Sequence, residues 1–280
     1  MTVTVEDIRY ATQAAGLSGK PLCVHSSLRS FGYVEGGAAA VVRALLDEGC
    51  TVLVPTFFSG FIIPPPPDMR PSRNAWNYDD PATDLTGVGR RYTPDTNEVD
   101  RYMGAIPAAM LGMEGRVRGN HPLNSFAAVG PLAHDLIDRQ TPDDVYAPFE
   151  RLVELGGSVV LMGVGLTSMT LIHVAEREAG RTLFRRWAND VDGNAVMVEI
   201  GSCSTGFNRF DPVLAPIERR ITVGDSLWQI FPAGPALEAA TRAIRADPSI
   251  THCGKHECRC NDAALGGPML DAMRSGRGAE

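Results

Sequence analysis

Three side chains with complementary chemistry lie one helical turn apart in the segment Thr170-Leu-Ile-His173-Val-Ala-Glu176. Residues three apart on a helix are neighbours, so a hydroxyl, an imidazole and a carboxylate meet on one face. His173 is suited to act as general base, Glu176 to hold its tautomer, and Thr170 to donate a hydrogen bond to a developing oxyanion. Spacing alone also fits a structural histidine among apolar neighbours, which is the more common arrangement.

Two further histidines lie where a cleft is expected. His25, with Ser26 and Ser27, ends a short apolar strand, where hydroxyls and backbone N–H groups can bind an amide-rich chain or a phosphate. The alternative is that a serine caps the next helix. His121 precedes Pro122 in an irregular stretch. From the residues alone, it is either a polar group in the same cleft or a loop histidine before a rigid proline.

The C-terminal stretch, residues 250–280, is rich in potential metal ligands, namely His252, Cys253, His256, Cys258 and Cys260. Zinc prefers thiolate and imidazole ligands, so we predict one structural Zn²⁺ bound by the three cysteines, with His256 or His252 as the fourth ligand. The spacing lacks a paired C-x-x-C knuckle. A patch of reduced cysteines near the C-terminus is therefore an equal alternative.

The regular elements that position these side chains alternate between strands and helices. Residues 21–25, 51–54 and 158–162 are apolar runs typical of buried strands, and a helix is predicted between the first two. This order predicts parallel pairing with a right-handed crossover. We therefore expect an α/β fold, with a mixed, largely parallel central sheet flanked by helices, built as a single domain over the whole chain. Ligands collect at the carboxyl ends of such strands, where His25 and the turn after Gly163 both lie.

Hydrophobic periodicity predicts the remaining elements. Helices are expected near residues 5–15, 38–46, 102–112, 131–138, 148–155, 168–177 and 236–246, and strands near 125–129, 194–200 and 227–231. No internal repeat is visible, so the sequence does not indicate stacked repeats.

A long stretch without periodicity, residues 58–100, follows the second strand. Its prolines, including the run from Pro64 to Pro67, exclude a regular element through most of it. Connections of this length inside a compact domain are usually functional, so we predict a substrate loop. Between residues 68 and 100 there are seven acidic residues against four arginines, and we predict that Asp79, Asp80 and Asp84 hold a cationic acceptor. The alternative is a solvated loop whose charges add little.

Composition limits the class of protein. The 280-residue chain is 44% hydrophobic and carries a formal net charge of -7, so it folds, does not suit a nucleic-acid backbone, and is compatible with a cationic small molecule. Neither a signal peptide nor a run of about 18 apolar residues is present, which predicts a cytoplasmic protein outside the membrane. Cys23, Cys50 and Cys203 lie far apart, as expected of reduced thiols. Motifs for dinucleotide binding, a P-loop or a serine hydrolase elbow are absent.

Three blocks of the sequence resemble the aminoglycoside 3-N-acetyltransferase family. They are Val24-His-Ser-Ser-Leu-Arg-Ser-Phe-Gly32 with Val54-Pro-Thr-Phe57, His121-Pro122 with Ser125-Phe-Ala-Ala-Val-Gly130, and Leu161-Met-Gly-Val164 with the segment from Thr170 to Glu176. The blocks follow one another in the family's order.

The resemblance implies direct transfer of an acetyl group from acetyl-CoA to the 3-amino group of an aminoglycoside, without a metal. It implies that His173 is the general base, supported by Glu176, and that Thr170 assists the oxyanion. It also implies that His121 faces the same cleft as a catalytic group. The residues implied to line the pantetheine arm of acetyl-CoA are His25, Ser26, Ser27, Leu28, Arg29, Ser125 and Phe126.

A histidine base suits this reaction because an ammonium group cannot attack a thioester, and the ordinary histidine pKa of about 6.5 lies near the working pH. Three other functions stay open. They are a non-catalytic or self-protection homologue that binds a small molecule, a hydrolase with a threonine or serine nucleophile, and an acetyltransferase for a different amine.

Overall fold

Three apolar runs form the centre of the main sheet. The computed structural model describes residues 2–71, 74–79, 85–255, 258 and 260. Strand β2 (Pro21–Ser26) lies between β4 (Thr51–Pro55) and β7 (Ser158–Met162), and both pairings are parallel. These strands are apolar without alternation because both faces of the sheet are covered.

The edges of this sheet are antiparallel. The seven strands have the order β10-β11-β7-β2-β4-β6-β5. The outer strands are β10 (Arg219–Val223), β11 (Ser226–Pro232), β5 (Val117–Arg118) and β6 (Phe126–Val129). Each of them pairs in antiparallel fashion. The turn from β10 to β11 is only two residues long, and parallel pairing needs a much longer crossover. The predicted α/β fold with a mixed central sheet flanked by helices is confirmed, but the sheet is not largely parallel as predicted, because only β4, β2 and β7 pair in parallel and the outer strands are antiparallel.

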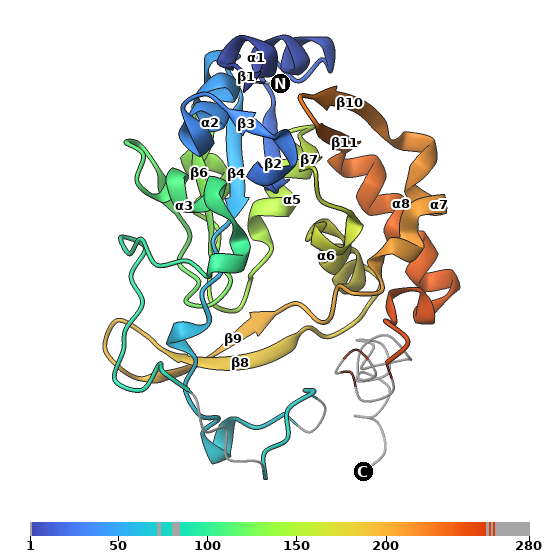
Figure 1. Ribbon diagram of the computed structural model, residues 1–280. Helices are drawn as coiled ribbons and strands as arrows, with labels where there is room; N and C mark the ends of the chain where they lie inside the picture. The colour runs from blue at the N-terminus through green and yellow to red at the C-terminus, as the bar shows by residue number, and fades with distance from the viewer. Residues whose placement is uncertain (1, 72–73, 80–84, 256–257, 259, 261–280) are drawn as a thin grey trace.

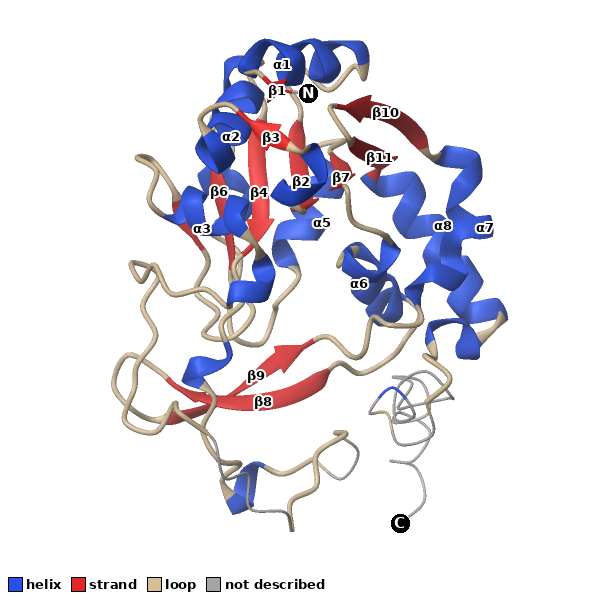
Figure 2. Cartoon of the chain, viewed as in Figure 1, coloured by secondary structure: helices blue, strands red, loops and turns tan. Residues whose placement is uncertain are grey.

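Helices cover both faces of the sheet (Figures 1 and 2). One face packs against α1 (Val5–Ala14), α2 (Gly37–Asp47) and α3 (Ala105–Leu111). The other packs against α4 (Ala133–Ile137), α5 (Ala147–Glu154), α6 (Leu171–Glu178), α7 (Asp211–Leu214) and α8 (Ala233–Ala246). Helix α1 begins at Thr4, whose side chain forms a capping box with Asp7.

A second, two-stranded sheet lies across the end of the molecule, below the central sheet in Figure 1. It consists of β8 (Phe184–Asn189) and β9 (Ala195–Ile200), which pair antiparallel. The long loop packs on it. The Ile63 N–H donates to the Trp187 carbonyl at 2.9 Å, and Trp187 Nε1 donates to the Met69 carbonyl at 2.9 Å. The loop between β4 and the 3₁₀ helix η4 (Arg101–Met103) is therefore anchored on the hairpin through much of its described part.

The sequence predicts most of these elements but misses β5, α7, β8 and β10. β8 and β10 each contain a pair of arginines, Arg185-Arg186 and Arg219-Arg220, that interrupts the apolar pattern. It also misses a short parallel pair, β1 (Thr2–Val3) with β3 (Tyr33–Val34). Short 3₁₀ helices lie at Leu28–Phe31 (η1), Ser59–Phe61 (η2), Pro67–Met69 (η3), Arg101–Met103 (η4), Leu166–Ser168 (η5), Phe207–Phe210 (η6), Ala215–Ile217 (η7) and Pro248–Thr251 (η8). Within the described part of the chain, no helix is long and apolar enough to cross a membrane.

Candidate active site

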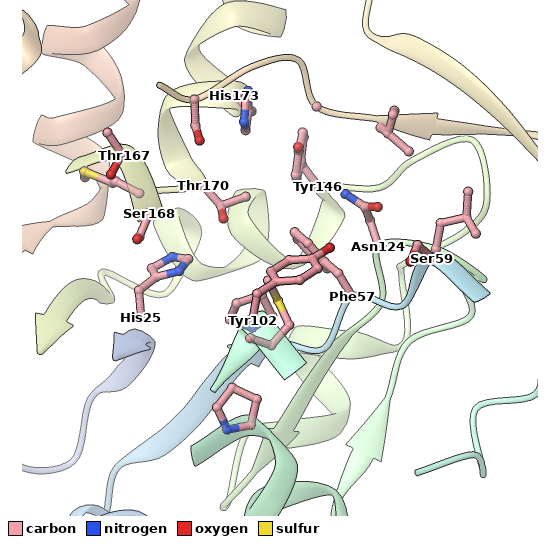
Figure 3. Close-up of a pocket in the computed structure, with 18 of the residues that line it drawn as sticks. His25, Phe57, Ser59, Tyr102, Asn124, Tyr146, Thr167, Ser168, Thr170 and His173 are labelled. Atoms are coloured by element: carbon pink, nitrogen blue, oxygen red, sulfur yellow. The ribbon is translucent and has the colours of Figure 1, made fainter. Parts of the chain in front are cut away.

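A cavity of about 490 Å³ opens at the carboxyl ends of the three central strands (Figure 3). β2 contributes His25 and Ser26, the end of β4 contributes Pro55, and the turn after β7 contributes Val164 and the stretch 167–170. Parallel strands end at the same edge of a sheet, so the segments that follow them form one crevice. The prediction that the two strand-end segments meet there is confirmed.

His173 and Glu176 form a buried hydrogen-bonded pair beside this cavity. The distance from His173 Nδ1 to Glu176 Oε2 is 2.7 Å, and the two residues are 8% and 2% exposed. A carboxylate only accepts hydrogen bonds, so in the neutral imidazole the proton lies on Nδ1. The lone pair of Nε2 is then available to a ligand in the cavity that His173 lines. The sequence spacing and the structure agree on this pair.

Thr170 lies at the start of α6 and also lines the cavity. It has helical backbone angles, and its hydroxyl does not cap the helix. Thr167 and Ser168 add two hydroxyls from the preceding 3₁₀ turn (Figure 3). The wall that carries His173 is therefore lined with short hydroxyl donors.

Glu176 is held by partners on three sides. Arg181 Nη1 lies 3.1 Å from its Oε1 atom, and the Ser202 hydroxyl donates to the carboxylate at 3.1 and 3.3 Å. Arg181 is 1% exposed. A buried carboxylate needs such partners to stay charged. The pair therefore has a fixed anion beneath the imidazole.

The ring of His173 is fixed by aromatic contacts. Phe207 meets it edge-on with ring centroids 4.8 Å apart, and the Tyr146 ring lies parallel to it at 6.2 Å. A side chain at Gly201 would come within 2.5 Å of the Tyr146 hydroxyl and 2.8 Å of the His173 ring. Glycine at position 201 is therefore required for this packing.

Tyr146 is a site residue that the sequence does not single out. Its hydroxyl is buried and has no hydrogen-bond partner among the described residues, and the side chain lines the cavity. Burial, together with the charge of Glu176, raises the pKa of the hydroxyl, so it remains a donor. Phe57, from the first family-like block, also lines the cavity, and other lining residues that sequence motifs do not reveal are Ser59, Tyr102, Asn124, Arg186 and Ser202. They come from segments that are distant in sequence.

Of the predicted cofactor residues at the end of β2, two line the cavity and three do not. His25 is 6% exposed and lines the cavity, and burial lowers its pKa to about 4, so it is neutral at physiological pH. Ser26 lines the cavity beside it. Ser27, Leu28 and Arg29 lie at the following 3₁₀ turn and are not among the lining residues, because this turn leads away from the strand end.

Three predicted site residues lie in the core instead of the cleft. His121 is fully buried, and its two ring nitrogens contact the Glu199 carbonyl at 2.8 Å and the Asn124 N–H at 2.8 Å. The Ser125 hydroxyl contacts Arg118 and Thr56, and Phe126 is fully buried. The prediction that these three side chains face the cavity is wrong, because their polar atoms are used to hold the loop and the phenyl ring packs in the core. Burial lowers the pKa of His121 to about 3.

The predicted acceptor residues do not line the cavity where the structure describes them. Asp79 is exposed and is not among the lining residues, while Asp80 and Asp84 lie outside the described residues. The far end of the loop reaches the cavity instead, through Tyr102 and Met103. Among the described lining residues there is no carboxylate.

The C-terminal cysteines come together with a fourth cysteine. Cys253, Cys258 and Cys260 group with Cys203, and their sulfur atoms lie within 4.8 Å of one another. Cys203 is a free thiol, as predicted, and the sequence does not reveal that it joins this group. His256, the predicted fourth ligand, lies outside the described residues, and His252 is not part of the described group.

Known proteins are similar to this chain in sequence and in fold. A family model described as aminoglycoside 3-N-acetyltransferase matches residues 23–245. Aminoglycoside N(3)-acetyltransferase IX of Micromonospora chalcea is 29% identical over 273 residues, which cover 87% of this chain and 94% of that protein. The solved structure of aminoglycoside acetyltransferase AAC(3)-Xa is 30% identical, with a TM-score of 0.68, and covers 87% of this chain and 93% of that one. AAC-IIIb, solved as a binary complex with CoASH, shares the fold at 21% identity and a TM-score of 0.73, with 88% and 97% covered.

Proposed function

Because the chain belongs to the aminoglycoside 3-N-acetyltransferase family, we propose that it transfers the acetyl group of acetyl-CoA to the 3-amino group of an aminoglycoside. The observation that carries this proposal is the His173–Glu176 pair, 2.7 Å apart and buried beside a cavity at the strand ends. We also propose that the enzyme acts in the cytoplasm, as the sequence predicts.

The acceptor reacts as a free amine. The substrate ammonium has no lone pair, so it first loses a proton to solvent, and His173 Nε2, as general base, then removes a second proton from the amine nitrogen as that nitrogen attacks. Glu176 accepts the Nδ1–H hydrogen bond and stabilises the imidazolium that forms, while Arg181 and Ser202 keep the carboxylate in place. This is the arrangement in which a carboxylate sets the tautomer and the orientation of an imidazole.

The acetyl group moves in one displacement at the thioester carbonyl. The amine nitrogen forms a bond to the carbonyl carbon, and the C–O π electrons move to the oxygen. The Thr170 hydroxyl lies beside His173 on the same wall of the cavity and donates to this oxyanion. Collapse re-forms the C=O bond and breaks the C–S bond. The coenzyme A thiolate leaves and takes the proton from the imidazolium.

The donor is proposed to lie along the end of β2. His25 and Ser26 line the cavity there, and the neutral His25 ring suits an uncharged amide arm. The CoASH complex of a protein with the same fold supports coenzyme A as the carrier. Ser27, Leu28 and Arg29 follow immediately and are proposed to meet the part of acetyl-CoA outside the cavity.

We propose that negative charge outside the cavity attracts the cationic acceptor. The net charge of -7 favours approach of a polycation. Asp79 is exposed, and with Asp80 and Asp84 it is proposed to steer the acceptor toward the site. Such steering weakens as salt screens the charges.

The test is a thiol-release assay with acetyl-CoA and a panel of aminoglycosides. Transfer predicts release that depends on the amine, with NMR placing the new amide at the 3-nitrogen of the product. Release that does not respond to any amine indicates a hydrolase. No release with any panel member, from protein that binds acetyl-CoA, contradicts the transferase assignment and indicates a binding protein.

A further inference from the structure

Four cysteines from two distant segments converge on one point. The Sγ atoms of Cys203, Cys253, Cys258 and Cys260 all lie within 4.8 Å of one another, and Cys253 and Cys260 are 3.4 Å apart. All four are free thiols. A tetrahedral zinc ion with Zn–S distances of about 2.3 Å has its sulfurs about 3.8 Å apart. The cluster already has the dimensions of such a site.

The fold brings the two segments together without the cysteines. Cys203 follows β9, and three residues later Gly206 packs against the carbonyls of Thr251 and His252, where a side chain would come within 2.5 and 2.7 Å. Cys253 follows directly. The close approach of these backbones places the first two sulfurs together, and the sulfurs of Cys258 and Cys260 lie in the same group.

We propose that Cys203, Cys253, Cys258 and Cys260 bind one structural Zn²⁺ that fastens the C-terminal segment to the wall of the active site. Four soft thiolates in a tetrahedral group select zinc over hard cations. A closed set of four protein ligands is typical of a structural site and leaves no open position for substrate. Four thiolates with Zn²⁺ carry two net negative charges. The Arg209 guanidinium lies beside the turn at Gly254 and partly balances them.

The site lies directly behind the catalytic pair. Ser202 and Ser204 flank Cys203, and both line the cavity. Ser202 donates to Glu176, and Arg181 bridges Glu176 to the Thr251 hydroxyl at 2.8 Å. Both segments joined by the metal therefore hold Glu176 in place. Loss of zinc is expected to loosen this carboxylate as well as the C-terminal segment.

The first experiment measures metal content in the full chain, purified without a histidine tag. Elemental analysis is expected to give one zinc per chain in the wild type and in Cys50→Ser. Cys50 is a matched control because it is a buried thiol in a different part of the fold, bonded to the Leu17 carbonyl. Cys203→Ser is expected to lose at least ten-fold in zinc affinity. Zinc retained at full stoichiometry and affinity in Cys203→Ser overturns Cys203 as a ligand.

The second experiment replaces zinc with Co²⁺ and reads the ligand set by absorption. Four thiolates predict strong thiolate-to-cobalt charge-transfer bands with the visible bands of tetrahedral cobalt, weakened in Cys203→Ser and unchanged in Cys50→Ser. Well below one zinc per chain in the wild type overturns the proposal. Iron instead of zinc in the elemental analysis also overturns the proposal. A protein mass that shows disulfides among these cysteines does the same.

The effect of the metal site on the His173–Glu176 pair is tested separately, by the melting temperature and kcat. Removal of zinc by a chelator is expected to lower the melting temperature and kcat of the wild type and to leave the KM for acetyl-CoA within about two-fold. Restored zinc is expected to return both values. Unchanged kcat in metal-free, folded protein contradicts the link to Glu176, while the metal site itself is judged by the first two experiments.

Discussion

In the described part of the chain, two histidine–carboxylate pairs each join residues one helical turn apart, and the surroundings of the two pairs differ completely. On α6, His173 and Glu176 are 2.7 Å apart, with side chains 10% and 2% exposed. On α4, His134 and Asp138 are 3.2 Å apart, with side chains 79% and 62% exposed. The first pair has Arg181 and Ser202 behind it and a cavity in front. The second faces solvent.

The comparison separates spacing from function. Both pairs satisfy the rule that residues three or four apart on a helix are neighbours. An exposed pair gains little from its charge because water screens the interaction, whereas burial and fixed partners hold the donor, acceptor and tautomer of the inner pair. A histidine can therefore act as a general base when buried partners hold its carboxylate and a cavity lies beside its imidazole.

The strongest test of the comparison removes each imidazole. His173→Ala is expected to lower kcat by ~10²–10⁴-fold, because a positioned general base contributes that much. His134→Ala is the matched control and is expected to keep kcat and KM unchanged. Steady-state rates on the best acceptor, with circular dichroism to confirm folding, measure both. Near-normal kcat in folded His173→Ala removes this histidine from the mechanism.

A second test removes each negative charge while keeping the shape. Glu176→Gln is expected to lower kcat by about 10- to 10³-fold, because an amide does not stabilise the imidazolium and permits the wrong tautomer. The effect is expected to be on kcat more than on the KM for either substrate. Asp138→Asn is expected to change neither. Equal effects of the two substitutions contradict the argument from burial.

The sequence predicts the inner pair because its chemistry is local. The segment from Thr170 to Glu176 contains the hydroxyl, the imidazole and the carboxylate within two turns of one helix, and the strand before it ends at a glycine. The central strands are predicted for the same reason, because their apolar runs can be recognised without knowing which strands pair with them. The element bounds follow within a few residues for the same reason.

Residues that act through distant segments are not predictable in this way. Tyr146, Ser202 and Arg181 reach the pair from α5's start, the loop after β9 and the turn after α6. Cys203 joins the C-terminal cysteines across about fifty residues of chain, so spacing could not reveal it. His121 stands in a family-like block, but its two nitrogens serve the backbone. Motifs give the residue types, and packing decides which way each side chain faces.

Acidification tests burial directly, through stability. Burial lowers the pKa of His25 to about 4 and of His121 to about 3, so the unfolded chain binds more protons than the folded one below pH 6.5. Stability is therefore complete above the ordinary pKa of about 6.5 and falls as the pH falls toward the folded values. Each histidine is expected to lower the free energy of unfolding by about 2 kcal/mol between pH 7 and pH 5.

Denaturant titrations at the two pH values measure this loss in matched variants. His121→Gln is expected to reduce the loss between pH 7 and pH 5 by about 2 kcal/mol, whatever its stability at pH 7. His134→Gln, on the exposed pair, is expected to keep the wild-type loss. If the two variants lose the same amount, His121 does not titrate as a buried group.

Tyr146→Phe tests whether a buried hydroxyl inside the cavity binds the substrate. The hydroxyl has no hydrogen-bond partner in the part of the chain that the structure describes, so its removal is expected to leave the melting temperature unchanged or slightly higher. A hydrogen bond from this hydroxyl to bound substrate predicts a fall of about 2- to 10-fold in kcat/KM. Unchanged kcat/KM shows that the hydroxyl is not used. A large loss of stability shows that it has a structural partner.

The smallest effect is expected from the exposed acids of the long loop. Exposed charges are worth ~0–1 kcal/mol each and are screened by salt, so steering predicts that the acceptor KM rises severalfold between low and physiological ionic strength. The KM for acetyl-CoA, itself an anion, is expected to stay flat or move the other way. Neutralising Asp79, Asp80 and Asp84 together is expected to raise the acceptor KM at low salt and to remove most of this salt dependence. The control neutralises Asp135, Asp138 and Glu154, exposed acids around α4 and α5, and changes the net charge by the same amount. Equal effects of the two triple variants indicate net charge alone. An acceptor KM that is flat with salt and unchanged by the loop substitutions excludes the loop as the cation site, and the lining of the cavity, which has no carboxylate among the described residues, then recognises the acceptor through hydroxyl, carbonyl and aromatic groups.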